Sequence, residues 1–145
     1  LQQAVAAQPG WDATAVDLRA QALERCADLL EAHRAELIAL CTREAGKTVS
    51  DGIAEVREAA DFCRYYAQQA RREFAPRLLT GPTGESNQLF LHGRGVFVCI
   101  SPWNFPLAIF IGQVAAALAA GNSVIAKPAE QTTLTAFVAT QLMHE

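Results

Sequence analysis

Apolar residues recur every three or four positions in the first half of the chain, and this periodicity predicts two amphipathic helices. The first apolar stripe consists of Val16, Ala20, Leu23, Ala27, Leu30, Leu37 and Cys41. Asp12 or Thr14 is expected to cap the start of this helix, and Gly46 is expected to end it. Thr48 and Asp51 have the spacing of a capping box at the start of the second helix. Its stripe consists of Ile53, Val56, Ala60, Cys63, Ala67 and Ala70.

The pattern changes after the second helix. Helix-breaking residues gather there: Pro76, Gly81, Pro82 and Gly84. The following segment, SNQLFLH, alternates as an extended strand. Because exposed ribbons of this kind often pair with a neighbouring chain, residues 76–94 are predicted to form an arm that joins copies of the protein in a homo-oligomer.

The last fifty or so residues alternate between short β-rich runs and longer apolar segments. GVFVCI and SVIAK predict two strands that are buried on both faces, and PLAIFIGQVAAALAAG predicts an apolar helix between them that ends at Gly121. TTLTAFVATQLM predicts a further helix with Leu134, Val138 and Leu142 on one face. This order of elements predicts parallel strands in a βαβα unit.

The sequence therefore predicts an α/β fold in three parts. Residues 1–75 form the helical pair, and residues 76–94 form the extended ribbon. Residues 95–145 form the first half of a Rossmann-like parallel sheet, which is incomplete within this sequence.

Composition narrows the classes of function. The 145 residues are 51% hydrophobic and 19% charged, which suits one domain with an apolar core. The net charge of -3 and the scattered basic residues give no electrostatic basis for binding nucleic acid. No window of about 18 uncharged apolar residues occurs, so we expect a cytoplasmic protein that does not bind membranes. Four widely spaced cysteines predict buried thiols rather than a metal site or disulfides: Cys26, Cys41, Cys63 and Cys99.

The segment Gly46-Lys47-Thr48 resembles the end of a phosphate-binding loop. That motif requires an earlier glycine at the position of Cys41, and it requires a strand before it rather than a helix. A helix C-cap at Gly46 explains the segment instead.

Polar residues follow the second predicted strand, in a region where open parallel sheets bind ligands. Lys127 and Glu130 flank the turn fixed by Pro128. The Glu130 carboxylate can accept hydrogen bonds from the hydroxyls of an adenosine ribose, and Lys127 can donate to the same ribose. A carboxylate would repel a 2′-phosphate, which favours NAD over NADP. A solvated strand end with two neighbouring charges is the alternative.

The first predicted strand leads into SPWNFP. Pro102 and Pro106 restrict this corner and so hold Trp103 and Asn104 in place. The uncharged Asn104 amide offers two N–H donors, which suit an oxygen that becomes an anion only in a transition state, an interaction worth about 3 kcal/mol. The alternative is a turn asparagine that bonds its own backbone.

These motifs carry a resemblance. PWNFPL and ALAAGNSVIAKPAEQT, together with EAGKT, are similar to the aldehyde dehydrogenase superfamily along the whole chain. GPTGESNQLFLHGRGVFVCISPWNFPLAIF most resembles the L-glutamate γ-semialdehyde (1-pyrroline-5-carboxylate) dehydrogenase part of bacterial bifunctional proline utilization A. The resemblance implies NAD-dependent oxidation of that aldehyde to glutamate, the second step of proline catabolism. A proline dehydrogenase domain earlier in a parent chain would bring FAD as well.

The resemblance also implies roles for individual residues. Asn104 would hold the oxyanion that forms when a cysteine thiolate attacks the aldehyde. Lys127 and Glu130 would bind the adenosine ribose. Phe105 would pack on the aliphatic part of the substrate, and Glu58 would approach its ammonium group, unless Glu58 is an ordinary exposed helix residue. The wall along the cofactor would be formed by Ile100, Ser101, Pro102 and Trp103.

The nucleophilic cysteine and the general base of this superfamily are expected beyond Glu145. Residues 1–145 alone are therefore expected to be inactive and to bind NAD weakly. Two further interpretations stay open: a dehydrogenase for another aldehyde, and a non-catalytic interaction module. The sequence after Glu145 would distinguish them.

Overall fold

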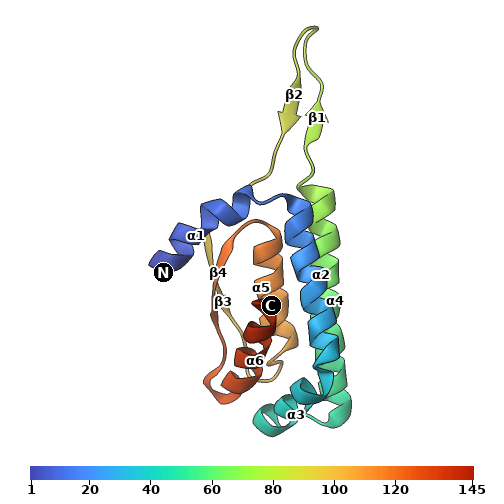
Figure 1. Ribbon diagram of the computed structural model, residues 1–145, viewed down its shortest axis with the longest axis vertical. Coiled ribbons are helices and arrows are strands. Elements are labelled where there is room, and N and C mark those ends of the chain that lie inside the picture. The colour runs from blue at the N-terminus through green and yellow to red at the C-terminus, as the bar shows by residue number, and fades with distance from the viewer.

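The computed structural model describes all of residues 1–145 and contains six α-helices and two two-stranded sheets. The helix α5 separates a layer formed by α2 and α4 from the strands β3 and β4 (Figure 1). None of the helices is both long and apolar enough to span a membrane. The elements are α1 (Gln2–Ala13), α2 (Val16–Ala32), α3 (Arg34–Ala45), α4 (Val49–Glu73), β1 (Arg77–Leu79), β2 (Asn87–Leu89), β3 (Val96–Ile100), α5 (Ala108–Ala119), β4 (Ser123–Lys127), a 3₁₀ turn (Glu130–Thr132) and α6 (Thr133–Met143).

The two predicted apolar stripes meet in the main core. The first-stripe residues from Ala20 to Cys41 are buried, and Val16 packs against them partly buried. On α4, every residue of the predicted stripe is buried except Ile53, which is 45% exposed. Small alanine side chains on α4 allow the α2 and α5 helices to approach it closely, so that large residues such as Leu30 and Phe110 fill the space between them.

The capping predictions are confirmed at α3 and α4. Gly46 follows α3 with a φ of 66°, a left-handed conformation that glycine adopts without strain. The Thr48 hydroxyl accepts a hydrogen bond of 3.1 Å from the Asp51 N–H at the start of α4. The predicted cap of α2 is wrong, because its N-cap is Ala15 and no side chain bonds there.

The chain between the start of α2 and Gly46 is not one helix. It breaks at His33, whose ψ of 16° departs from helical values, and α3 continues in a new direction beside the lower end of α4 and below α6 (Figure 1). No proline or glycine marks this break, and the apolar spacing continues through it unaltered. The sequence pattern therefore predicts one helix where the structure has two.

Helix α1 precedes the predicted helices and has no buried residue. It contains Pro9, which together with Gly10 gives a turn signal rather than a helix signal. Hydrogen bonds to distant backbone hold it instead, since the Trp11 Nε1 donates to the Leu118 carbonyl over 2.8 Å.

The predicted ribbon is a hairpin that projects from one end of the molecule (Figure 1). β1 pairs antiparallel with β2, with Arg77 opposite Leu89. The strand in SNQLFLH is thus confirmed, and its partner β1 was not predicted. Large apolar side chains on and next to the hairpin are exposed: Leu78, Leu79, Leu89, Phe90 and Leu91.

The βαβ unit has the predicted parallel strands. β3 and β4 pair over five residues, from Val96 opposite Ser123 to Ile100 opposite Lys127. The expected burial is wrong for both strands. On β3, Val98 is 61% exposed and Ile100 is 64% exposed. On β4, only Ser123 is buried, and Ala126 and Lys127 are exposed. α5 covers one face of this strand pair, and nothing in residues 1–145 covers the Val98 and Ile100 side chains.

The buried face of α6 also differs from the prediction. Leu142 is buried as expected, but Leu134 is 57% exposed. The face in contact with the core carries small residues, namely Thr135, Ala136 and Ala139. These residues allow a closer approach of α6 than a leucine stripe would.

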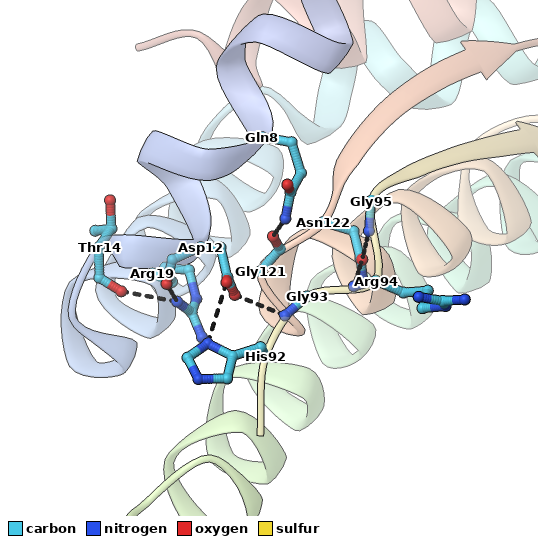
Figure 2. Close-up of polar contacts among 10 residues, drawn as sticks. All are labelled: Gln8, Asp12, Thr14, Arg19, His92, Gly93, Arg94, Gly95, Gly121 and Asn122. Atoms are coloured by element: carbon cyan, nitrogen blue, oxygen red, sulfur yellow. Dashed lines mark hydrogen bonds and ion pairs between the residues drawn. The ribbon is translucent and has the colours of Figure 1, made fainter. Parts of the chain in front are cut away.

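Polar contacts fix the start of β3 and β4 (Figure 2). Asn122 is 4% exposed, and its Oδ1 accepts hydrogen bonds from the N–H groups of Arg94 and Gly95. The Asp12 carboxylate accepts a hydrogen bond from the Gly93 N–H. The predicted helix cap Asp12 thus ties α1 to the end of the ribbon.

Replacement of this buried amide should destabilise the protein. Asn122→Ala leaves two backbone N–H groups without their acceptor and should lower the free energy of unfolding by about 3 kcal/mol. The exposed pair of Gln21 and Asp17 provides a control, since Gln21→Ala should change that energy by less than about 0.5 kcal/mol. Urea unfolding measures both. Equal stability of the two variants would contradict this role of Asn122.

Candidate functional site

Both corners predicted to carry chemistry leave the sheet at the same edge. The register places Ile100 opposite Lys127, and the Ser101 N–H donates to the Lys127 carbonyl over 3.2 Å. The segment after β3 and the segment after β4 therefore start side by side. This is the edge at which ligands bind in open parallel sheets.

The corner after β3 presents polar and aromatic groups to solvent. Asn104 and Trp103 are exposed, whereas Pro106 is buried and anchors the corner. The hydrogen bonds of the corner are made by the N–H groups of Leu107 and Ala108, and the Asn104 side chain takes no part in them. Its amide is therefore free to meet a molecule at this edge.

The cofactor-side residues offer groups that fit a ribose. Lys127 and Glu130 are both exposed at the end of β4. Ile100 is exposed beside them, and Pro102 is half-buried. The Ser101 hydroxyl is buried at the same edge and has no hydrogen-bond partner in the chain. A cation and a carboxylate, both exposed at one strand edge, suit the hydroxyl groups of a sugar.

A buried ion pair lies under the Asn104 corner. The Glu55 Oε2 accepts hydrogen bonds from the Leu107 and Ala108 N–H groups, over 3.1 and 2.9 Å. Its Oε1 lies 2.9 Å from the Lys47 Nζ. The Lys47 ammonium also lies 4.0 Å from the centre of the Phe105 ring, so it faces the aromatic expected to contact the substrate.

A second carboxylate lies under the corner after β4. Glu44, at the end of α3, accepts hydrogen bonds from the Leu134 and Thr135 N–H groups and from the Thr135 hydroxyl. It caps the N-terminus of α6, as Glu55 caps that of α5. The sequence analysis did not identify either role. The sequence pattern did indicate that Glu55 is buried, because this residue falls on the buried side of α4 between Gly52 and Ala59.

Glu58 lies one helical turn beyond Glu55 on α4 and is exposed. It borders a surface hollow of about 540 Å³ with Asp61, Phe62 and Tyr65. The structure therefore places Glu58 on an accessible surface with two aromatic neighbours, and Phe105 belongs to a different contact, with Lys47.

The four cysteines are buried, as predicted. Burial raises the pKa of Cys41 to about 12, and the nearby Glu55 carboxylate contributes in the same direction. A hydrogen bond to Cys26 and burial raise the pKa of Cys63, and burial raises that of Cys99. Hydrogen bonding lowers the pKa of Cys26, but only 4% of that residue is exposed.

The family model for "Aldehyde dehydrogenase family" matches residues 1–145. The chain belongs to the aldehyde dehydrogenase family. The bifunctional protein PutA of Salmonella typhimurium is 56% identical over 136 residues, which are 94% of this chain and 9% of that protein. A succinate-semialdehyde dehydrogenase of Paenarthrobacter nicotinovorans is 39% identical over 100% of this chain and 32% of its own length. The chain thus spans a small part of these family members.

Solved structures agree with the aldehyde dehydrogenase fold. A crystal structure of a proline utilization A mutant from Bradyrhizobium japonicum superposes with a TM-score of 0.96 at 60% identity, over 97% of this chain and 15% of that one. A 1-pyrroline-5-carboxylate dehydrogenase from Thermus with bound NAD gives a TM-score of 0.92 at 36% identity, over 97% of this chain and 28% of that one. The predicted α/β class and the family resemblance are confirmed.

The buried thiols should react slowly in the native protein. With a pKa of about 12, about one in ten thousand Cys41 side chains is a thiolate at a pH of about 8. An aromatic disulfide reagent, which releases a coloured thiolate when it reacts, should therefore modify none of the four thiols quickly in the folded protein. After unfolding in guanidinium chloride it should modify all four. Rapid modification of one thiol in the folded protein would mean that it is reactive rather than structural.

Proposed function

We propose that the protein containing this chain oxidises L-glutamate γ-semialdehyde, the open form of 1-pyrroline-5-carboxylate, to glutamate with NAD as the oxidant. The main support is the parallel register of β3 and β4, which brings the Asn104 corner and the Lys127–Glu130 corner to one edge. The similarity to PutA and to 1-pyrroline-5-carboxylate dehydrogenase supports the substrate.

In this reaction Asn104 acts on the carbonyl oxygen. When the thiolate of the parent enzyme adds to the aldehyde carbon, the oxygen gains negative charge, and the Asn104 N–H groups donate to it. Because the oxygen becomes an anion only as the thiolate adds, the Asn104 amide stabilises it more in the transition state than in the neutral aldehyde. Phe105 and Glu58 hold the substrate, by packing on its methylene groups and by attracting its ammonium group.

The edge residues bind the cofactor. Glu130 accepts hydrogen bonds from the adenosine ribose hydroxyls, and Lys127 donates to the same ribose. Ile100, Pro102 and Trp103 pack along the dinucleotide, and Ser101 belongs to the same wall of the site. When bound, NAD would supply the hydride acceptor for the carbon that the thiolate has attacked, and hydrolysis of the resulting thioester by water would release glutamate and the free thiolate.

The hairpin is the proposed contact between copies of the protein. The hairpin projects away from the helical layers (Figure 1), and apolar residues on and next to it are exposed, among them Leu78 and Phe90. Residues 76–94 are thus proposed as the oligomerisation arm, beside a helical part at 1–75 and a nucleotide-binding part at 95–145. A parent chain that also holds a proline dehydrogenase domain would bind FAD there.

Oxidation of another aldehyde is the second candidate. Its support is the 39% identity to succinate-semialdehyde dehydrogenase over the whole chain. That substrate carries a carboxylate and no ammonium group, so Glu58 would have no charge partner on it. Kinetics of the full-length enzyme with both aldehydes separate the two candidates, because the proposed function requires a higher kcat/KM for the amino-acid aldehyde.

Removal of the Asn104 amide should slow the chemical step. In the full-length enzyme, Asn104→Ala should lower kcat by about a hundredfold or more, because the transition-state oxygen loses its donors. The dissociation constant for NAD, measured by calorimetry, should stay within about twofold, since the ribose ligands lie on the other corner. Comparable losses of kcat and of NAD affinity would indicate that Asn104 is structural.

Neutralisation of Glu130 should weaken the preference for NAD. In the same enzyme, Glu130→Gln removes the repulsion of a 2′-phosphate, so the ratio of kcat/KM for NAD over NADP should fall about tenfold. The double variant Glu130→Gln/Gln131→Glu keeps the net charge and moves the carboxylate to the neighbouring exposed position, so it serves as a control for charge alone. An unchanged ratio in Glu130→Gln would exclude Glu130 from cofactor discrimination.

A further inference from the structure

Glu55 is a buried carboxylate that none of the proposed catalytic steps uses. It is 2% exposed, and it lies on α4, more than fifty residues before the backbone N–H groups that it contacts. Its two oxygens have different partners: Oε2 bonds the first N–H groups of α5, and Oε1 faces Lys47. No other side chain caps α5, so Glu55 alone accepts hydrogen bonds from the N–H groups at its start.

Lys47 extends the contact to the corner itself. Its side chain is 15% exposed and reaches from the loop between α3 and α4 to the face of the Phe105 ring. The ion pair thus contacts the chain at three points: the ring of Phe105 and the N–H groups of Leu107 and Ala108. Asn104 is the residue directly before this fixed segment.

Stability alone gives a weak reason for such a pair. Buried ion pairs contribute little net stability, because the loss of hydration offsets the attraction, and apolar replacements are often as stable. The effect of such a pair on the position of a catalytic donor is larger than its effect on stability. A donor that stabilises a developing oxyanion must lie within hydrogen-bond distance of the place where the charge appears, and small displacements of such groups reduce the rate strongly.

We propose that Lys47 and Glu55 are positioning residues for aldehyde oxidation: by fixing Phe105 and the first turn of α5, they hold the Asn104 amide where the oxyanion forms. This inference rests on the proposed function. Glu44 fixes α6 through a similar contact but lies under the other corner, so the effect of Lys47 and Glu55 is specific to the Asn104 side.

The test uses the full-length enzyme and the substitution Lys47→Met, which keeps the length of the side chain and removes the ammonium. We expect kcat to fall about tenfold or more, with KM for NAD within about twofold of the unmodified enzyme. Lys47→Arg should restore kcat to within about threefold, because a guanidinium can pair with Glu55 and lie over Phe105.

Arg64→Met is the matched control. Arg64 also makes ion pairs with carboxylates, those of Asp28 and Glu31, and it is far less buried than Lys47. Its replacement should leave kcat unchanged. Thermal unfolding of each variant checks that it is folded, and Lys47→Gln replaces Lys47→Met in every comparison if the methionine variant does not fold.

A double-mutant cycle with Asn104→Ala separates positioning from a general structural role. If Lys47 acts through Asn104, the double variant should have a kcat within about twofold of Asn104→Ala alone. Multiplied losses, or an unchanged kcat in Lys47→Met beside a slow Asn104→Ala, would overturn the inference and leave the proposed function standing. A wild-type kcat in Asn104→Ala would remove Asn104 from the proposed mechanism and overturn the inference with it, whereas a full-length enzyme that does not oxidise the amino-acid aldehyde with NAD would overturn the proposed function itself.

Discussion

The arrangement of the candidate site depends on one buried contact, the Glu55 carboxylate beneath the N-terminus of α5. A carboxylate with 2% exposure is costly to desolvate unless every oxygen has a partner, and here two backbone N–H groups and the Lys47 ammonium provide them. Because α5 begins three residues after Phe105, this contact joins the helical layer directly to the corner that carries Asn104.

The N-terminal helices therefore do more than cover the sheet. The break at His33 turns α3 toward α6, so that Glu44 reaches the first N–H groups of that helix. Each of the two helices that follow a strand is thus capped by a carboxylate from the helical layer, and the two corners between strand and helix are fixed from behind. Residues about 50 to 90 positions apart in the chain hold one edge of the sheet together.

The sequence predicted the elements whose signals are local. The apolar stripes, the Thr48 cap, Gly46 and the parallel strands all follow from spacing or residue type. The burial of β3 was wrong because a β-rich run implies neighbours on both faces, and residues 1–145 supply a neighbour on one face only. The helix α1 and the capping roles of Glu44 and Glu55 depend on contacts with distant backbone, which no periodicity encodes. The one indication in the sequence was that Glu55 falls on the buried side of α4.

At the Asn104 corner the charged groups lie on the inner side and the neutral amide lies on the exposed side. This arrangement affects how the site would distinguish the transition state from the substrate. A free lysine next to the reacting carbonyl would attract any anion, including a substrate carboxylate, and would bind the ground state as well as the transition state. Here Glu55 neutralises Lys47 and the Phe105 ring lies over its ammonium, so the charge contacts the inner side of the corner. What the corner offers at its exposed side is an amide, whose dipole gains most when the carbonyl oxygen becomes an anion. In the proposed mechanism, the charge pair and the neutral donor thus have complementary roles: one fixes the geometry, and the other provides the selective interaction.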